Sequence, residues 1–585
     1  MNMNRTGCHI KSLALCIMAL LSSANAWSQV SPSFPLLHKG YNEKYTVFTD
    51  RSLYIAGEDL YLSIFDCSEE EIRSVCRSKV VYIELVKADG EVVTEAKFPL
   101  TAEGTEGCIS IPEKTVSGSY FLRSYTRWMR NFSPAGYAYN RIKIINPSLM
   151  EADHPVTDTT GYSCRFVPAD PMINEAIPIR CFTNKSVYGI REKAVLSVEI
   201  PALSQNILNR FCVTVARPGA VSASGKVRIE GKNGEDGEQY ILRYLPESEG
   251  LMVSGTVLSK KTGEPAKNAF VQLAVLDAKG DYLSYTTGPD GKFFFSLLPL
   301  LGRNDLFVTA RNAADDELEI RVDKDYANHN IALFTGPFIL DQQERSLALD
   351  MMVNAQVRKA YAEKFRQVGL PVKTDSSIRC FYGKPLKTVY IDDFIALPTL
   401  EEVFFELVPE ITIGKRKDIT YMELVGHSRN NADLASYNPL ILLDRIPVYN
   451  LKDLLEISPG KIQRIEIIND VYIKGNVTYG GVVSIFSRKG DLAGIKLPRN
   501  SYFFDFSGYF PRTPESEMIP DPSSSRRIPD FRNCLYWNPE IHINPGNKAS
   551  LEFYTSDNKG EFEVVVHGLT AEGEILEKRC RFRVE

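Results

Sequence analysis

Hydrophobic positions along most of the chain follow the pattern of β-strands. Between residues 41 and 147, short apolar or alternating segments such as YTVFTD, LYLSIFD and VVYIELV are separated by turns that contain Gly, Asp and Ser. Comparable segments recur in 162–248, 251–323 and 531–585. This pattern predicts a mainly β protein, in which small Ig-like β-sandwiches follow one another along the chain.

Two regions depart from the strand pattern. Residues 341–369 carry apolar positions at helical spacing, which predicts a linking helix that packs on a neighbour through its apolar face, with a partner-binding role as the alternative. Residues 380–490 alternate strand-like segments with short helical patterns near 400–407 and 451–457. This second region is therefore expected to fold as a small α+β domain.

The first 26 residues (1–26) have the features of a signal peptide. Basic residues precede an apolar core, Leu13–Leu21, that is too short to cross a bilayer, and Ala24–Ala26 offers small residues for cleavage. A lipoprotein signal ending at Cys16 is the alternative, although a bulky leucine stands directly before this cysteine. No later stretch reaches the roughly 18 apolar residues of a membrane-spanning helix. We therefore expect an exported protein with no integral membrane segment in its mature chain.

Charge and cysteine content narrow the kinds of partner and cross-link. Lys and Arg together number 68 and Asp and Glu number 73, so the net charge is −5. No run of basic residues would follow the phosphates of a nucleic acid, and we expect no nucleic-acid partner. Beyond the signal peptide, Cys67 and Cys76 are the cysteines closest in sequence. They are the candidate disulfide in an oxidising compartment.

The sequence lacks the residue patterns of common catalytic and metal sites. The seven histidines are scattered singly, and there is no H-E-x-x-H, C-x-x-C or G-x-S-x-G segment. We therefore predict no catalytic residue, no cofactor and no metal, and a protein that is not an enzyme. A site assembled from distant residues would leave no such pattern, so an envelope hydrolase with an unrecognised site is an alternative.

A turn motif, TDRSLYIAGEDLYL at Thr49–Leu62, opens the first predicted sandwich, and GSYFLRSYTRWMRN follows at Gly118–Asn131. Gly57 can adopt a positive φ in this turn, and Tyr54 can pack beneath it while its hydroxyl finds a partner. These segments resemble the second macroglobulin-type domain (MG2) of the α2-macroglobulin family. The segment IPIRCFTNKSVYGIREKAVLSVEI in 162–248 is similar to the third domain of that family.

Two further regions are similar to known domains. VSGTVLSKKTGEPAKNAFVQLAVL and DGKFFF in 251–323 resemble the carboxypeptidase regulatory-like domain, a seven-stranded sandwich without catalytic residues. Region 531–585 is similar to macroglobulin-type strand pairs, and we expect it to complete a sandwich whose other strands lie earlier. The thioester of macroglobulin protease traps is not expected, because Asp236 stands where the cysteine before Gly237-Glu238-Gln239 would be required.

Three strand segments of the α+β domain form a familiar order. PLILLDRIPVYN, IQRIEII and GGVVSIFSRKG, all within 380–490, resemble the plug domain of TonB-dependent receptors. These receptors usually carry Gly where this chain has Arg445, so the tip of the turn is expected to have a different shape. The residues expected to contact or position a partner, with fold maintenance as the alternative role of their side chains, are Asp444, Arg445, Pro447, Tyr449, Gly480 and Gly481.

We expect no barrel to follow the plug-like domain. Only 95 residues follow position 490 (585 − 490), and their Pro- and Ser-rich part cannot supply membrane strands. The resemblance implies a non-enzymatic protein of the periplasm, associated with the outer membrane. It would present its plug-like domain to an outer-membrane β-barrel, either a nutrient receptor or a protein-export translocon. A structural or adhesive envelope protein built from several sandwiches is the alternative.

Overall fold

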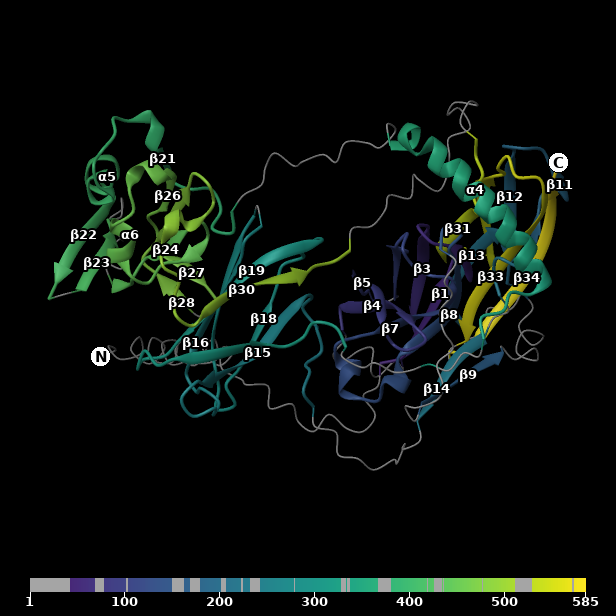
Figure 1. The fold of residues 1–585 in the computed structure, drawn as a ribbon, viewed down its shortest axis with the longest axis horizontal. Coiled ribbons are helices and arrows are strands. Elements are labelled where there is room, and N and C mark those ends of the chain that lie inside the picture. The colour runs from purple at the N-terminus through teal and green to yellow at the C-terminus, as the bar shows by residue number, and fades with distance from the viewer. Residues whose placement is uncertain are drawn as a thin grey trace, which may run out of the picture.

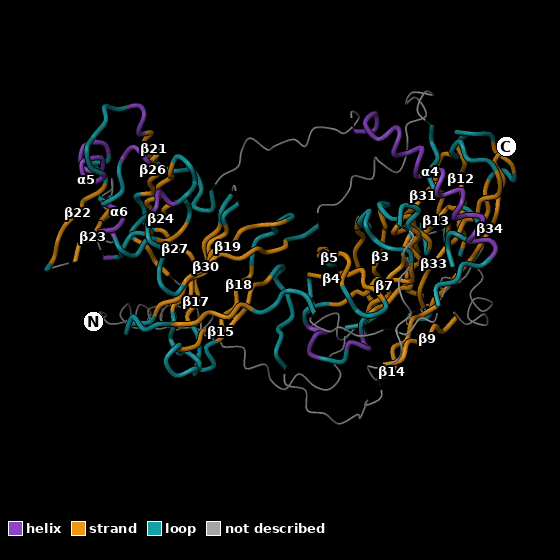
Figure 2. Tube along the Cα trace, in the orientation of Figure 1, coloured by secondary structure: helices purple, strands orange, loops and turns teal. Residues whose placement is uncertain are grey.

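The computed structural model confirms a mainly β protein (Figure 1, Figure 2). Its strands form small sheets, most of which stack as β-sandwiches, and its helices are few. The α+β domain lies at one end of the molecule, and the C-terminus lies near helix α4 at the other end (Figure 1). The residues that the structure describes are 43–68, 78–101, 104–149, 162–168, 179–200, 207–222, 225–231, 242–277, 279–327, 333, 337–366, 380–417, 419–425, 434, 436–475, 477–510, 529–544, 546–570 and 573–585.

The first sandwich lies within residues 43–149. One of its sheets has the strand order β1-β3-β6 and the other β2-β8-β7-β4-β5, and in these sheets only β2 and β8 run parallel. Its elements are β1 (Tyr45–Thr49), β2 (Leu53–Ile55), β3 (Asp59–Asp66), β4 (Val80–Lys87), β5 (Val92–Pro99), β6 (Gly104–Ser110), β7 (Gly118–Tyr125), β8 (Ala138–Ile145) and the 3₁₀ turns Trp128–Asn131 and Pro134–Gly136.

A buried hydrogen-bonded turn joins β1 to β3 in this sandwich. The hydroxyl of Tyr54 donates to Asp50 Oδ1 at 2.7 Å and accepts from the backbone N–H of Arg51 at 3.1 Å. The carboxylate of Glu58 accepts from Arg51 Nη1 at 3.1 Å. Gly57 has a φ of 91°, so the turn uses a conformation that glycine adopts freely. The predicted roles of Tyr54 and Gly57 are confirmed.

The second sandwich repeats this turn at the same residue spacing. The hydroxyl of Tyr188 donates to Asn184 Oδ1 at 2.6 Å and accepts from the backbone N–H of Lys185 at 3.0 Å. The carboxylate of Glu192 accepts from the backbone N–H of Gly189 at 2.6 Å. The short strand inside each turn runs parallel to its neighbour, as β2 does to β8 and β11 to β34. The two sandwiches are therefore built on the same local design.

The second sandwich is assembled from two distant parts of the chain. Strand β12 pairs with β32, and β13 lies between β31 and β33. The C-terminal region 531–585 thus completes a sandwich begun by residues 180–216, and the regions 162–248 and 531–585 are not two separate domains. Strands β9 (Tyr162–Pro168) and β14 (Gly225–Gly231) form a two-stranded sheet of their own. The strands of the sandwich are β10 (Arg180–Thr183), β11 (Val187–Tyr188), β12 (Lys193–Glu199), β13 (Ile207–Ala216), β31 (Cys534–Ile541), β32 (Lys548–Tyr554), β33 (Gly560–Thr570) and β34 (Ile575–Val584).

The third sandwich contains seven strands, one of which lies outside the predicted range 251–323. Its sheets have the orders β18-β15-β20 and β17-β16-β19-β30, and β30 follows the α+β domain in sequence. The boundary predicted at residue 323 is corrected, because β30 covers the edge of β19 that would otherwise be open. The strands are β15 (Met252–Ser259), β16 (Phe270–Val275), β17 (Asp281–Thr286), β18 (Lys292–Ser296), β19 (Arg303–Arg311), β20 (Leu318–Val322) and β30 (Ser501–Ser507).

The α+β domain has a mixed sheet with the order β21-β26-β29-β24-β25. Strands β24 and β29 run parallel, and the other pairs run antiparallel. Side chains alternate along β24, so Leu440 and Leu442 face one side of the sheet while Leu443 packs in a separate core on the other side. Its elements are β21 (Lys387–Tyr390), α5 (Leu400–Leu407), β22 (Ile411–Arg416), β23 (Ile419–Leu424), β24 (Leu440–Leu443), β25 (Ile446–Pro447), α6 (Leu451–Leu455), β26 (Ile462–Ile468), β27 (Tyr472–Lys474), β28 (Val477–Tyr479), β29 (Val482–Ser487) and the 3₁₀ turns Ile391–Asp393, Pro459–Lys461 and Leu492–Gly494.

The domains are nested in the chain. The strands of the second sandwich enclose the third sandwich in sequence, and the strands of the third sandwich enclose the α+β domain. Because β30 and β31–β34 return to earlier sandwiches, each inserted domain is attached to its host by two chain connections. Two connections restrict the rotation of a domain more than the single linker of a tandem string would.

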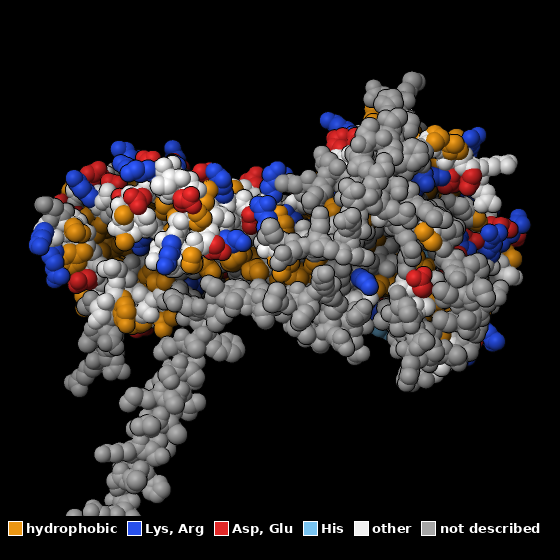
Figure 3. Space-filling view, turned by 90° about the horizontal axis from the view of Figure 1, so that it is seen from below, with side chains coloured by type: hydrophobic (Ala, Val, Ile, Leu, Met, Phe, Trp, Pro, Cys, Tyr) orange, Lys and Arg blue, Asp and Glu red, His pale blue; other side chains and the backbone are white. Residues whose placement is uncertain are grey.

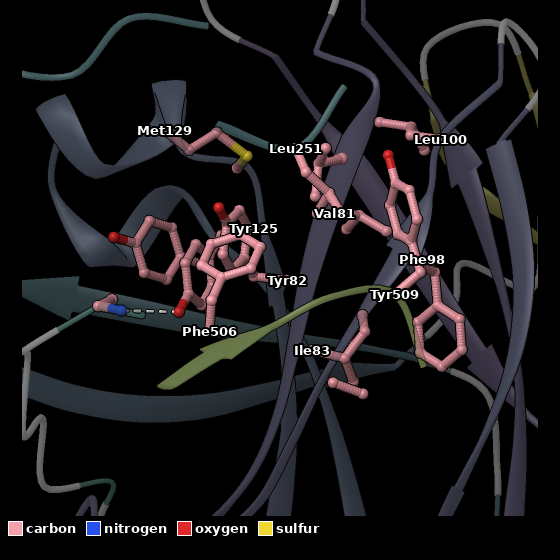
Figure 4. Packing of buried hydrophobic residues seen from close by; sticks show 14 of the residues in the cluster. Val81, Tyr82, Ile83, Phe98, Leu100, Tyr125, Met129, Leu251, Phe506 and Tyr509 are labelled. Carbon is pink, nitrogen blue, oxygen red and sulfur yellow. Dashed lines mark hydrogen bonds between the residues drawn. The ribbon is translucent and has the colours of Figure 1, made fainter. Parts of the chain in front are cut away.

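The first and third sandwiches share one continuous hydrophobic core, part of which is shown in Figure 4. Lys97 of β5 is fully buried at this junction. Its ammonium group forms an ion pair with Asp325, donates to the carbonyl oxygen of Ser507 at 2.6 Å and lies 4.0 Å from the ring centre of Phe506. A buried cation with this many partners is satisfied only when both sandwiches are in place.

Helix α4 (Gln342–Arg366) packs across the first and second sandwiches. Leu347 and Met351 are buried with Leu53 of β2 and Ala216 of β13. Lys143 of β8 pairs with Glu344 in the first helical turn at 2.6 Å. The predicted packing of this helix on its neighbours is confirmed.

Candidate functional site

The plug-like turn joins β24 to β25 through two residues, Asp444 and Arg445. Leu443 pairs with Ile446 across this hairpin, and the φ angles of Asp444 and Arg445 are 47° and 71°. Two residues with positive φ form the type I′ geometry that matches the twist of a hairpin. Arg445 thus adopts the left-handed conformation that was expected to require glycine.

The carboxylate of Asp444 holds this turn in place. Its oxygens accept hydrogen bonds from the backbone N–H of Ser487 at 2.8 Å, from the hydroxyl of Ser487 at 2.6 Å and from the backbone N–H of Leu492 at 2.9 Å. A left-handed residue other than glycine costs roughly 1–2 kcal/mol. Each hydrogen bond to a charged group contributes about 1.5–3 kcal/mol, so this network offsets the strain at Arg445. Asp444 is therefore a positioning residue of the turn.

The tip of the turn contacts the third sandwich. The side chain of Arg445 lies against Gly280, where an added Cβ would come within 2.9 Å of Arg445 Cδ. Ile446 is buried with Ala274 of β16 and Phe307 of β19. Gly280 has a φ of 64° and lets the arginine side chain lie close to its backbone, and the turn is part of a contact between two domains of the same chain.

Pro447 and Tyr449 extend this contact. Pro447 is buried in β25, where it pairs with Leu442. The guanidinium carbon of Arg311 in β19 lies 4.6 Å from the ring centre of Tyr449. Tyr449 itself is 37% exposed, so it lies at the edge of the contact with the third sandwich.

Gly480 and Gly481 permit close backbone approach. A Cβ on Gly480 would lie 2.2 Å from the carbonyl oxygen of Tyr437, and one on Gly481 would lie 2.5 Å from the carbonyl oxygen of Ile468. Gly481 also has a φ of 101°. Leu440, the first residue of β24, donates its N–H to the Gly481 carbonyl oxygen at 2.9 Å. These glycines account for how β24 and β29 come together, which is a role in maintaining the fold.

A second group of contacts joins the same two domains. Lys474 Nζ in the β27–β28 hairpin pairs with Asp281 at 2.6 Å. The hydroxyl groups of Tyr282 and Tyr479 lie 3.3 Å apart, and Tyr282 packs with Leu442. The third sandwich therefore covers one face of the α+β sheet as well as the plug-like turn.

The other face of the α+β sheet is covered by α5 and α6, and the outer surface there carries exposed apolar side chains. Leu400, Val403 and Phe404 of α5 are buried, whereas Phe405 is 79% exposed. Ile395, in the loop before the helix, is 91% exposed. Figure 3 shows orange apolar side chains among charged ones at this end of the molecule. The exposed large apolar residues of this region, which we call the distal set, are Leu386, Tyr390, Phe394, Ile395, Phe405, Ile419 and Val425.

The distal set was not singled out from the sequence. The segment LEEVFFEL shows its inward positions by helical spacing, and the second phenylalanine of the FF pair falls between them. Phe405, placed off the apolar face of an amphipathic helix, is the signal that could have indicated an exposed contact residue.

Several predictions fall outside the residues that the structure describes. These include the signal peptide, Cys16, the segment Asp236–Gln239 and Cys76. The proposed pairing of Cys67 with Cys76 therefore stays a prediction.

Within the described ranges, no group of three His, Cys, Asp or Glu side chains is placed to hold a metal ion. No helix among the described residues combines the length and apolar character needed to span a bilayer.

Comparisons with known proteins find resemblance at the level of structure. No protein-family model and no curated protein matches the chain. α2-Macroglobulin from Salmonella, reacted with methylamine, is 10% identical with a TM-score of 0.23, and the match covers 93% of this chain and 40% of that one. Trypsin-activated α2-macroglobulin from Escherichia coli is 10% identical with a TM-score of 0.22, covering 95% and 42%. Dimeric latent PorU from Porphyromonas gingivalis is 10% identical with a TM-score of 0.14, covering 48% and 34%.

The chain thus resembles bacterial α2-macroglobulin multi-domain proteins in its general structure. It spans about 40% of the length of these macroglobulins. At this identity and TM-score, the resemblance concerns the β-rich multi-domain build alone.

Proposed function

We propose that this protein is a non-enzymatic interaction protein of the cell envelope, which presents its α+β domain to an outer-membrane β-barrel. The observation that supports this proposal best is the asymmetry of that domain. One face of its sheet and the plug-like turn are held by the third sandwich, whereas large apolar side chains in and around β21, α5 and the β22–β23 hairpin are exposed.

The distal set has the character of a contact surface. Ile395, Phe405 and Ile419 are each more than 70% exposed. Groups of exposed large apolar residues on a soluble domain mark sites of protein contact. The β22–β23 hairpin adds exposed basic residues, Lys415 and Arg416, which can form a polar rim.

The nested architecture suits a domain that must be held at a defined position. The α+β domain enters and leaves through the third sandwich, and that sandwich shares a core with the first. Rigid attachment of the α+β domain to the third sandwich reduces the entropy lost on binding, because the orientation of the domain is already restricted in the free protein. The choice of an outer-membrane barrel as partner rests on the plug-like order of segments in 380–490.

The predicted site residues take a revised place in this proposal. Asp444, Arg445, Pro447 and Tyr449 would position the domain on its own chain, and the partner would contact the distal set. Variants of the turn should therefore weaken binding through misplacement of the whole domain, whereas variants of the distal set should weaken it without a change in stability.

The proposal is tested by affinity purification of the tagged protein from cell envelopes in a mild detergent. The native chain should retain one barrel protein, and a chain in which a Gly/Ser linker replaces residues 380–490 should not. The double variant Ile395→Ser and Phe405→Ser should also lose the barrel protein. The matched control is the double variant Leu298→Ser and Leu301→Ser, which removes exposed leucines of the third sandwich and should keep it.

Purification of the native chain without any outer-membrane protein would contradict the proposal. Cleavage of the sandwiches by protease added to intact cells would also contradict it and favour a surface-exposed structural or adhesive protein. Turnover of peptides or glycans by the pure protein, abolished by a single carboxylate substitution, would instead indicate an envelope hydrolase.

A further inference from the structure

Two cysteines from distant parts of the chain meet inside the second sandwich. Cys181 lies in β10 and Cys580 in β34, which are separated by 399 positions in sequence (580 − 181). These strands belong to opposite sheets and lie against each other. Both side chains pack in the same hydrophobic core, where Phe582 and Val584 of β34 are also buried.

The two cysteines lie in one core, on strands that contact each other. A hydrogen bond between them raises the pKa of the Cys181 thiol and lowers that of the Cys580 thiol. Cys181 is buried and Cys580 is partly exposed. Strands β10 and β34 face each other across the sandwich and direct both cysteines into its core, which is the arrangement that a cross-link between facing strands needs.

We propose that Cys181 and Cys580 form a disulfide that joins the two sheets of the second sandwich. Each cysteine loses its thiol proton as the S–S bond forms, and the pair releases two electrons. The electron acceptor is a thiol–disulfide oxidant, whose own disulfide is reduced to two thiols.

The difference in solvent exposure between the two cysteines determines which one reacts first. Cys580 is the thiol that an oxidant can reach, and the Cys181 hydrogen bond favours its thiolate. The Cys580 thiolate attacks the oxidant's disulfide and forms a mixed disulfide, releasing one oxidant thiolate. The Cys181 sulfur then attacks Cys580 and releases the second oxidant thiol. Cys181 needs no access to solvent for this second step, because its target is already beside it.

The disulfide would join the two ends of the chain segment that carries the inserted domains. The loop between Cys181 and Cys580 contains the third sandwich, helix α4 and the α+β domain. A long loop is the case in which a cross-link restricts the unfolded chain most. The C-terminal strands, which complete the sandwich from the far end of the chain, would then be retained even when the sandwich opens locally.

The test is a peptide map of the full exported chain, purified after its free thiols are blocked. The expected result is one cross-linked peptide pair that contains Cys181 and Cys580 and disappears after reduction. Reduced protein treated with oxidised glutathione should regain the same pair. Reduction should also lower the melting temperature of the native chain by roughly 5 °C or more.

Variants separate this cross-link from other effects of cysteine removal. In Cys181→Ser, Cys580 should become open to alkylation in unfolded, unreduced protein, and reduction should lower the melting temperature less than it does in the native chain. The matched control is Cys212→Ser in β13 of the same sandwich, which should keep both the cross-link and the response. If both Cys181 and Cys580 are alkylated in the unmutated chain after it has been unfolded without reduction, before and after treatment with oxidised glutathione, the proposal is overturned.

Discussion

Arg445 shows how a network of hydrogen bonds can hold a residue in a conformation that its side chain disfavours. The sequence predicts a proline-containing turn here, and the left-handed backbone at Arg445 was not foreseen, because propensity alone assigns such turns to glycine. The carboxylate of Asp444 supplies the missing stabilisation through Ser487 and Leu492.

Asp444→Ala is therefore expected to destabilise the α+β domain by about 3 kcal/mol, since it leaves backbone donors of Ser487 and Leu492 without a charged acceptor. Faster amide hydrogen exchange in residues 482–487 would report this loss. The control is Asp470→Ala, an exposed carboxylate in the same domain, which should leave the exchange unchanged. Equal exchange in both variants would show that Asp444 does not hold the turn.

Glu247 is a buried carboxyl at the junction of the first and third sandwiches. Its Oε1 accepts from the hydroxyl of Tyr82 at 3.0 Å and from the backbone N–H of Met252 at 3.1 Å. Burial raises its pKa to about 7, although Arg127 and Lys97 lower it. Since the unfolded carboxyl titrates near a pKa of about 4.3, the folded protein binds the extra proton between these two values.

A raised pKa in the folded state means that stability falls as pH rises. The contribution of Glu247 is complete below about pH 4 and is lost as pH rises through about 7, with a limit of about 4 kcal/mol. Glu247→Gln, which stays neutral, should therefore have a higher melting temperature than the native chain at pH 8.5 and a similar one at pH 5. An unchanged difference between the two proteins across this pH range would contradict the assignment.

Helix α4 could be predicted as an element, but the surfaces on which it packs could not. Helical spacing in 341–369 predicts its existence, and its role depends on two sandwiches that the local pattern does not identify. Met351 is fully buried between them, whereas Leu349 on the same helix is 63% exposed. Apolar residues at neighbouring positions thus differ in burial because the helix touches its supports with one face only.

Met351→Ala should lower the free energy of unfolding by about 3 kcal/mol, because a buried methionine leaves a cavity when it is truncated. Leu349→Ala, which removes a solvent-exposed side chain, should change it by less than about 0.5 kcal/mol. Urea denaturation of the two variants distinguishes these cases. Similar midpoints for both would mean that α4 does not bridge the sandwiches.

Local patterns and distant pairings were predictable to different degrees. The turn around Tyr54 and Gly57 could be predicted because its hydrogen bonds close within a few residues. The strand β30 could not be assigned to the third sandwich, since nothing in SYFFDFS says which open edge it will cover. The distal set was missed for a related reason: exposure depends on what packs nearby, and sequence spacing shows only the inward positions of α5.

At the scale of the whole molecule, nesting changes what the domains can do. Single linkers between sandwiches would allow the α+β domain to rotate freely. Here β30 and the C-terminal strands pair with strands of earlier domains, which restricts this rotation. The shared core around Lys97 joins two of these sandwiches. The distal set therefore lies at one end of a molecule whose domains are held in a fixed arrangement. The proposed interaction depends on this arrangement.

The most direct test of this account is photo-crosslinking in intact cells. A photoreactive amino acid would replace Phe405 in one variant and Leu301 in another, since both positions are exposed and they lie in different domains. The account predicts that position 405 is cross-linked to an outer-membrane β-barrel protein and that position 301 is not. Failure of position 405 to capture any outer-membrane protein, or equal capture by both positions, would contradict it.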